Sequence, residues 1–520
     1  MKKEAFNVSF RSPLMVSALT LALAAAGCAS APPDRSVQAA PDFARAQHAA
    51  SIRLAKDGWP EARWWSRYGD AQLDALVERA LRDSPTMAVA ATRIGGAQAA
   101  LASARSVGGG ALGLELGANR QRYSGNGFFP APIGGSFYND AAVQVKASYD
   151  VDWWGKQRAL VAASLGEVNA RQADAAQAER ELAASVVQSY LRLQLLWARR
   201  DNTLAMAQLQ GELIAERRAR VKRGLATLDA QTVAERDLAA LQEQAAGFAT
   251  QAGREREALR NLVGAASGNP SNNQADPLTV TPHAVHGGAA SLPSELGLAL
   301  LARRPDLQAA RWRVEATLGR VQANQAAYYP DLNLTGAFGL DATSLSKLLA
   351  YNSRTMVVGT VIDLPLFHSR ALDANLEGAR AGRNAAIADY NDAVFRAVAE
   401  VAEEGATLQG LELQQAAQAR AQAASAALVD TSRRRIERGL GERATLLEAR
   451  QALLRQQDSA LYIQDAALQT EVALTRALGG GYAAGLPLDA AAKLTAIPAP
   501  TPAPAPAPAA TPNPSHQEPS

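Results

Sequence analysis

Two long stretches without proline set the main constraint on the fold of this 520-residue chain. No proline occurs in residues 133–269 or 366–486, so nothing there forces a helix to break. Within residues 155–222 side chains of the apolar face recur at helical spacing, at Leu182, Val186, Ser189 or Tyr190, Leu193 and Leu196. About 68 residues at ~1.5 Å each predict a helix of roughly 100 Å, longer than any in an ordinary globular domain. Such helices are expected to pack against near-parallel neighbours.

The composition agrees with long helices and excludes some functions. Apolar residues make up 48% of the chain but aromatic residues only 5%. Alanine supplies much of that total, and alanine-rich sequence with spaced leucines favours helices. The formal net charge is +3, and no basic stripe indicates a nucleic-acid surface. Beyond the N-terminal segment no apolar run is long enough for a membrane helix, so a membrane crossing would have to use strands.

A tight turn is predicted after each long helical segment. The segments end in "RVKRGL" (220–225) and "RIERGL" (435–440). Gly224 and Gly439 suit a reversal of the chain because glycine tolerates positive φ. Shorter returning helices are expected at residues 229–263 and 444–478.

The chain repeats itself, which indicates two copies of one unit. "LVERALRDSPTMAVAATRI" (76–94) parallels "LGLALLARRPDLQAARWRV" (296–314). Three matched pairs keep the same order at separations of 220, 212 and 215 residues: Pro85 with Pro305, Leu160 with Leu372, and Leu225 with Leu440. Each copy is expected to begin with a helix of moderate length, at residues 70–106 and 293–327.

Each copy also carries two segments with the alternation of a β-strand. The strands are predicted at about residues 110–124, 141–154, 331–342 and 354–367, with apolar and polar residues alternating. Aromatic residues gather near the segment ends, including Tyr123, Phe128, Phe129, Tyr138, Trp153, Trp154, Tyr328, Tyr329 and Phe367. Aromatic girdles at strand ends are typical of outer-membrane barrels, although a soluble hairpin fits the alternation equally well.

The N-terminus has the layout of a bacterial lipoprotein signal. Lys2, Lys3 and Arg11 precede a short apolar run that ends at Gly27, and the chain's single cysteine, Cys28, follows. We expect lipidation of Cys28 after cleavage, with Ala29 resembling the sorting pattern for the outer membrane. The alternative is an ordinary signal peptide and a chance cysteine. In either case one cysteine forms no internal disulfide.

These features together resemble the TolC-like outer membrane efflux proteins, over about residues 59–482. The resemblance is carried by "WWSRYGDAQLDALVERAL", "YDVDWWGKQRA", "LLARRPDLQAARWRVEATLGRVQANQAAYYPDLNLTG" and "ALTRALGGGY". With Cys28, the nearest branch is the NodT-type lipoprotein subunit of tripartite pumps. Four strands cannot close a barrel alone. The resemblance implies a mainly α homotrimer in which three chains share a twelve-stranded membrane β-barrel, continued by a long periplasmic α-helical barrel.

The resemblance also implies partners and a location. The protein would be anchored in the outer-membrane lipid of a Gram-negative bacterium and would bind a periplasmic adaptor (membrane fusion) protein and an inner-membrane pump, often of the resistance-nodulation-division class. It would conduct small toxic compounds or drugs passively. Two alternatives remain: the outer-membrane channel of type I protein secretion, and a structural periplasm-spanning coiled-coil lipoprotein.

The expected organisation follows the two copies. The signal peptide covers 1–27, a lipidated spacer 28–58, the first repeat 59–267, a linker 268–292, the second repeat 293–486 and a Pro/Ala-rich disordered tail 487–520. The candidate site residues divide by role. The adaptor-contact tips are Arg223, Gly224, Leu225, Arg438, Gly439 and Leu440; the periplasmic gate is Asp229 and Glu448; the structural helix start is Arg304, Pro305 and Asp306.

Both functional assignments have a structural alternative. The tip glycines suit a turn whether or not an adaptor binds there. Many family members place Asp six residues after the tip glycine, where this chain has Ala230 and Thr445, so Asp229 and Glu448 also fit a solvated helix face. The five histidines, at 48, 283, 286, 368 and 516, show no metal-ligand spacing, and "SVGGGALG" leads into a strand and not a helix, unlike a phosphate loop. We therefore predict no enzyme, metal or cofactor.

Overall fold

The computed structural model describes residues 31–34, 54–55, 59–225, 227–264, 279–285, 287, 292–293, 303–365 and 369–482. The predicted lipidation residue Cys28, the signal segment 1–27 and the tail 487–520 lie outside these ranges, as do Phe367 and His368. Among the helices of the described ranges, none combines the length and apolar character that a membrane crossing requires.

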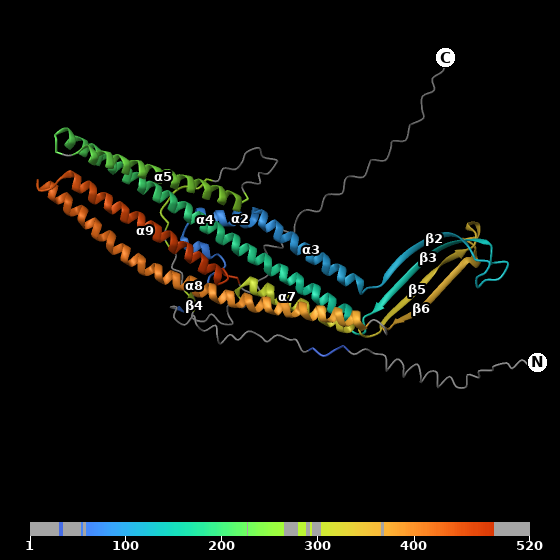
Figure 1. Ribbon diagram of the computed structural model, residues 1–520. Coiled ribbons are helices and arrows are strands. Elements are labelled where there is room, and N and C mark those ends of the chain that lie inside the picture. Colours follow the sequence, from blue (N-terminus) through green and yellow to red (C-terminus); the bar gives the residue numbers. More distant parts are fainter. Residues whose placement is uncertain are drawn as a thin grey trace, which may run out of the picture. The chain divides into compact units, whose positions relative to one another are not determined.

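The element order repeats in the two halves (Figure 1). The first half contains α2 (Ala71–Asp83), α3 (Pro85–Val107), β2 (Ala111–Arg122), β3 (Phe137–Val151), α4 (Lys156–Lys222) and α5 (Leu228–Leu262). The second contains α7 (Pro305–Ala326), β5 (Asp331–Ala342), β6 (Arg354–Asp363), α8 (Ser369–Glu437) and α9 (Arg443–Ala477). Helices α4 and α8 have 67 and 69 residues, which confirms the predicted long helices. Short elements complete the fold: η2 (Trp64–Tyr68), η3 (Leu345–Lys347), η4 (Tyr351–Ser353), and β1 (Leu54–Ala55) paired in parallel with β4 (Leu292–Pro293).

The predicted first helix, 70–106, is wrong because it is broken in two. Ser84 is extended, with φ −68° and ψ 136°, and its Oγ accepts from the backbone N–H of Thr86 at 3.3 Å. Pro85 is the first residue of α3, where its missing N–H leaves no bond unmade. A residue before proline is also driven out of the α conformation. The helix predicted from residue 293 likewise differs, since Pro293 lies in β4 and α7 begins at Pro305.

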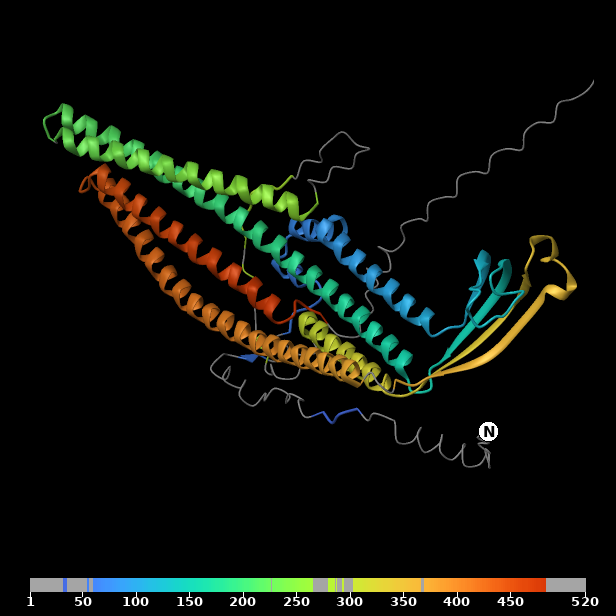
Figure 2. The ribbon, with the colours of Figure 1, turned by 45° about the vertical axis from the view of Figure 1, so that its right-hand side comes forward.

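The helices form two hairpins that pack on each other. Helix α4 packs on α5, and α8 packs on α9, while α4 also contacts α9, α7 and α3 (Figure 2). A core lies between α2, α4, α5 and α9, with fully buried Leu73, Tyr190, Leu191, Leu193 and Leu259. A second core joins α7, α8 and α9, around Leu307, Val401 and Leu474.

A partly buried polar cluster attaches part of the linker to the first core. Asp70 caps α2 and accepts from Tyr190 Oη at 2.6 Å and from His283 Nε2 at 2.8 Å. Gln194 Nε2 donates to the carbonyl oxygen of Thr281 at 2.9 Å. Burial, together with the bond donated to Asp70, raises the pKa of Tyr190. Residues 279–285 are therefore held against α2 and α4 by side chains that sequence analysis assigned no role.

The strands form one antiparallel sheet in the order β2-β3-β5-β6. Its register places the alternating residues of all four strands on two distinct faces. Most of the exposed apolar side chains share one face: Leu112, Leu114, Leu116, Val145, Tyr149, Leu334, Phe338, Met356, Val358 and Ile362; the exposed Val357 and Val361 of β6 lie on the other. The predicted alternation is thus realised as one mainly apolar face, which is largely exposed except at its far end, where Leu348 packs against Ala141 and Ala342.

Strand boundaries differ modestly from those expected. Strand β3 begins at Phe137, before the predicted 141, because its pairing with β2 extends to Arg122. Strand β6 ends at Asp363 instead of 367, where Leu364 and Pro365 lead out of the sheet. Proline has no N–H for a further ladder bond.

Candidate functional site

The tips of the two hairpins share one turn geometry. Gly224 and Gly439 have φ of 71° and 73°, in the left-handed region that favours glycine. The backbone N–H of Leu225 donates to Arg220 O at 2.9 Å, and that of Leu440 to Arg435 O at 2.8 Å. These bonds close the helix ends in the pattern of a Schellman turn. The glycines account for the turns, whereas the side chains of Leu225 and Leu440 are 68% and 77% exposed and belong to none of the hydrophobic clusters of the described residues.

Ion pairs connect the two hairpins close to their tips. Arg220 binds Glu442 at 3.0 and 3.2 Å, Arg217 lies 3.7 Å from Glu448, and Arg443 lies 3.3 Å from Glu212. Each pair joins the α4 hairpin to α9 or to the residue that caps it. A fourth link is buried, where Gln451 Nε2 donates to Gln210 Oε1 at 2.8 Å.

The two predicted gate residues lie in different surroundings. Glu448 is on α9 and faces Arg217 of α4. Asp229 lies in the exposed first turn of α5, where its charge complements the helix dipole. Arg217 also donates to Ala230 O at 3.2 Å, so it contacts α5 as well as α9. The structure therefore does not pair Asp229 with Glu448, but places Arg217 between their helices. Sequence analysis missed Arg217, Arg220 and Glu442, whose ion-pair partners lie more than 200 residues away along the chain.

The Arg304–Pro305–Asp306 sequence connects three helices. Pro305 begins α7 and Asp306 lies in its first turn. The Arg304 guanidinium is nearly buried; it donates to Asp306 at 2.7 Å, to Glu400 of α8 at 2.8 Å and to Ala477 O of α9 at 3.0 Å. Burial alone would lower the pKa of Arg304, but the Asp306 and Glu400 carboxylates raise it. Arg304 thus joins α7 to the middle of α8 and to the C-terminal end of α9, beyond the helix-start role expected.

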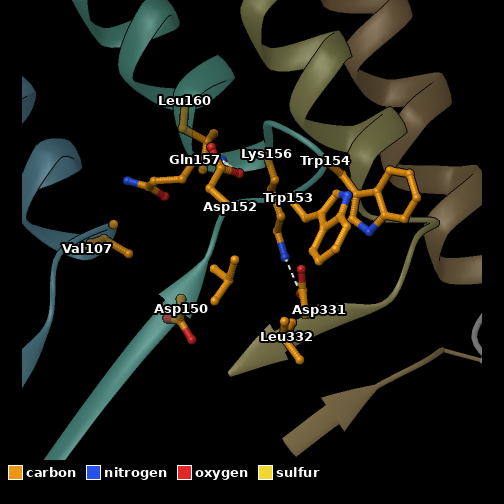
Figure 3. A pocket seen from close by; sticks show the side chains of 12 residues that line it. Val107, Asp150, Asp152, Trp153, Trp154, Lys156, Gln157, Leu160, Asp331 and Leu332 are labelled. Atoms are coloured by element: carbon orange, nitrogen blue, oxygen red, sulfur yellow. Dashed lines mark hydrogen bonds and ion pairs between the residues drawn. The ribbon is translucent and has the colours of Figure 1, made fainter. Parts of the chain in front are cut away.

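A pocket of about 250 Å³ lies where the sheet meets the helices (Figure 3). Its polar side chains bind one another. Lys156 Nζ lies 2.8 Å from Asp331, and Trp154 Nε1 donates to Pro330 O at 3.0 Å while its ring stacks on Tyr329 at 4.5 Å. Because Lys156 and Asp331 neutralise each other across the gap between α4 and β5, their ion pair serves to fix the strand-to-helix junction.

Asp152 begins helix α4 from this junction. Its carboxylate accepts from the backbone N–H groups of Gln157 and Arg158, both at 2.9 Å. Burial would raise the pKa of Asp152, but these two bonds and the Arg158 guanidinium hold it below the ordinary 3.8. A group with a lowered pKa stabilises the fold above its ordinary pKa and loses that effect as the pH falls through the folded value.

We therefore expect D152A to destabilise the protein at neutral pH by about 1 kcal/mol, the usual effect of a lost helix cap. The difference between D152A and wild type should shrink as the pH falls below 3.8. Thermal unfolding at several pH values measures both effects. D201A, which removes an exposed carboxylate from the middle of α4, serves as the control and should leave the midpoint unchanged. Equal midpoints for D152A and D201A at neutral pH would contradict the capping role.

The face of the sheet opposite the apolar one is polar and acidic. Alternation assigns to it one lysine, Lys146, and six carboxylates: Glu115, Asp140, Asp150, Asp331, Asp341 and Asp363. Lys146 pairs with Glu115. The excess of carboxylates gives this face a negative potential.

The first described residues bind to buried arginines of α8. Arg380 and Arg383 have side chains only 4% and 5% exposed, and both contact Asp34. Ala31 packs beside Val321, Tyr328 and Leu376, close to the start of β5. The segment 31–34 is therefore fixed near the boundary between helices and sheet, a contact with no signal in the sequence.

Comparison with known proteins agrees with this architecture. The family description "Outer membrane efflux protein" matches residues 76–265 and 297–480, one stretch in each half. The multidrug resistance outer membrane protein MdtP of Escherichia coli K12 is 35% identical over 84% of this chain and 90% of its own. MdtQ of Escherichia coli O157:H7 is 33% identical over 90% of this chain and 98% of its own.

Solved structures show the same fold. The outer membrane protein VceC of Vibrio cholerae superposes with a TM-score of 0.72 at 29% identity, covering 81% of this chain and all of that one. The CmeC outer membrane channel of Campylobacter jejuni superposes with a TM-score of 0.76 at 19% identity, covering 90% and 98%. With the repeated strand and long-helix architecture, these matches establish that the chain belongs to the outer membrane efflux protein family.

Proposed function

We propose that this protein is the outer-membrane channel of a multidrug efflux system, passing small toxic compounds to the exterior without catalysis. The two-faced sheet carries the proposal. A wall between lipid and water requires an apolar outer face and a polar inner face, and the acidic face of this sheet meets the second requirement. The names of MdtP and MdtQ, which refer to multidrug resistance and the outer membrane, support the assignment.

The sheet requires partners to close. Strands β2 and β6 are its two edges, and open edges cannot lie in lipid. Because the strands alternate in direction, β6 of one copy can pair antiparallel with β2 of the next. Three copies of the four-stranded sheet would give an even-stranded antiparallel barrel, as such barrels require. A homotrimer with a helical barrel below the membrane follows from this arrangement.

The hairpin tips would be the docking site for a periplasmic adaptor connected to an inner-membrane pump. The supporting observation is the exposure of Leu225 and Leu440 beside glycines that already account for the turns. The ion pairs of Arg217 and Arg220 would hold the periplasmic end closed until the adaptor engages. Glu448 contributes to this closure through Arg217, and Asp229 contributes local negative charge.

Lipidation of Cys28 fits the position of the segment 31–34. Two residues lie between Cys28 and Ala31, so three steps along the chain span at most about 10 Å. Ala31 lies beside Tyr328, which precedes β5 by a short turn, so an acyl chain on Cys28 would enter the membrane next to the barrel. Mass spectrometry of the mature N-terminus tests this; the acyl mass should disappear in C28A.

We expect D34A to lower the stability of the folded protein without preventing lipidation of Cys28. The substitution leaves the buried guanidiniums of Arg380 and Arg383 without the carboxylate that they share. Removing one partner of a buried ion pair lowers the free energy of unfolding by roughly 3 kcal/mol. The measurement is the temperature at which the trimer dissociates on a gel. D392A, which breaks an exposed pair on the same helix, is the control. An unchanged dissociation temperature for D34A would exclude a stabilising role for this contact.

Planar-bilayer conductance with parallel mass measurement tests the function. A trimer with discrete openings is expected, and the acidic inner face predicts a reversal potential that favours cations in a salt gradient. A monomer or filament without conductance, even when the tip ion pairs are removed, would overturn the channel and favour the structural lipoprotein. Loss of drug resistance on gene deletion separates efflux from protein secretion, which predicts loss of an exported protein instead.

A further inference from the structure

Three arginines lie on the apolar face of the sheet at the end remote from the helices. Strand β2 leaves α3 at Ala111 and ends at Arg122, so Arg120 and Arg122 are at its far end. Strand β6 starts at Arg354, which pairs with Leu340 of the apolar face. Arg120 and Arg122 alternate with Leu112, Leu114 and Leu116, so they belong to that face too.

These arginines stack on aromatic rings and make none of the ion pairs found in the described part of the chain. The guanidinium of Arg120 lies 5.3 Å from the ring centre of Phe137, and that of Arg122 lies 5.9 Å from it. Arg354 lies 4.1 Å from the ring centre of Tyr351. Aromatic stacking orients a guanidinium while leaving its N–H donors available. All three side chains are exposed.

The arginines of β2 and the arginine of β6 come together if the sheets of neighbouring copies join as proposed. Arg120 and Arg122 are on the edge strand β2, and Arg354 is on the opposite edge strand β6. Pairing β6 with the next β2 would bring all three arginines to each seam between protomers. The carboxylates near this end, Asp140 and Asp341, alternate onto the other face of the sheet.

Cations on a lipid-facing surface need anions at the membrane boundary. Guanidinium binds phosphate through paired N–H donors, and clustered arginines suit a headgroup with more than one phosphate. Nearby Phe137, Tyr351 and Met356 offer apolar and aromatic contacts at the same level. With the helices in the periplasm, this end of the sheet faces the outer leaflet.

We propose that Arg120, Arg122 and Arg354 bind the phosphorylated sugar headgroup of an outer-leaflet glycolipid at each protomer seam. The inference rests on the proposed trimer and its orientation. It adds a lipid ligand and three binding residues to the channel function.

The test measures binding of lipid A with two phosphates to the purified protein in detergent, by native mass spectrometry. Each basic side chain near an anionic membrane surface changes affinity by about fivefold, so R120Q/R122Q/R354Q should bind roughly 100-fold more weakly. The control R82Q/R396Q/R433Q removes three exposed arginines from helices and should bind like wild type. Dephosphorylated lipid A should bind wild type as weakly as the triple variant binds intact lipid A.

Equal lipid A affinity for the two triple variants would overturn the site. Equal affinity of wild type for lipid A and phosphatidylglycerol would overturn the glycolipid assignment. R354Q alone, with an expected fivefold loss, keeps the test valid if the triple variant does not assemble. The conductance and mass measurements report separately on the channel, so a conducting trimer without selective binding contradicts only this inference.

Discussion

L225D/L440D should abolish drug resistance while leaving the channel itself intact. Both leucines are more than two-thirds exposed at the hairpin tips, so neither substitution disturbs packing within the chain. If the tips receive an apolar adaptor surface, a charge in that contact would weaken docking by roughly 30-fold per anchor, the level of an interface hot spot. Because a trimer presents Leu225 and Leu440 three times each, the loss of drug resistance should be as large as that caused by deleting the gene. Drug susceptibility measures it.

The companion measurements distinguish lost docking from lost folding. Trimer mass and single-channel conductance of L225D/L440D should match wild type, and cross-linking to the adaptor should disappear. L349D is the matched control. Leu349 is 86% exposed, like the tip leucines, but it lies just before β6, at the end of the sheet remote from the helices and from the hairpin tips. Full resistance in L225D/L440D would rule out the tips as the adaptor site. Reduced resistance in L349D as well would indicate a general effect of the added charge.

The fold could be predicted largely because its main signals are local. The absence of proline predicted α4 and α8, the two tip glycines predicted the reversals, and period-two alternation predicted the strands. The break at Ser84–Pro85 was also visible, since a residue before proline leaves the α region. It was missed because helix-forming residues continue on both sides of the proline.

The candidate site was less predictable because its contacts join distant parts of the chain. Arg220 and Glu442 are 222 residues apart, and Asp34 and Arg383 are 349 apart. No pattern within one segment identifies such partners. The three arginines on the apolar face of the sheet escaped sequence analysis for the same reason. Arg120 reads as an ordinary polar residue until the register assigns it to the apolar face and stacks it near Phe137.

Loosening the ion pairs near the tips should open the periplasmic end of the channel. R217A/R220A removes the contacts from α4 to Glu448 and Glu442. These pairs are partly exposed, so each contributes about 0.5 kcal/mol. A trimer holds six of them, and concerted opening would add their effects to about 3 kcal/mol. The ratio of open to closed channels should therefore rise roughly 100-fold in bilayer recordings.

Related changes to the ion pairs near the tips should differ in their effect on channel opening. High salt should open the wild-type channel partly, because it screens exposed pairs, and should change R217A/R220A little. E448Q should produce part of the effect, whereas D229N should lower cation preference without opening the channel. R433A breaks a pair with Glu437 inside one helix near the same tip and should leave gating unchanged. An unchanged open fraction in R217A/R220A, at both salt concentrations, would show that closure depends on contacts other than these ion pairs.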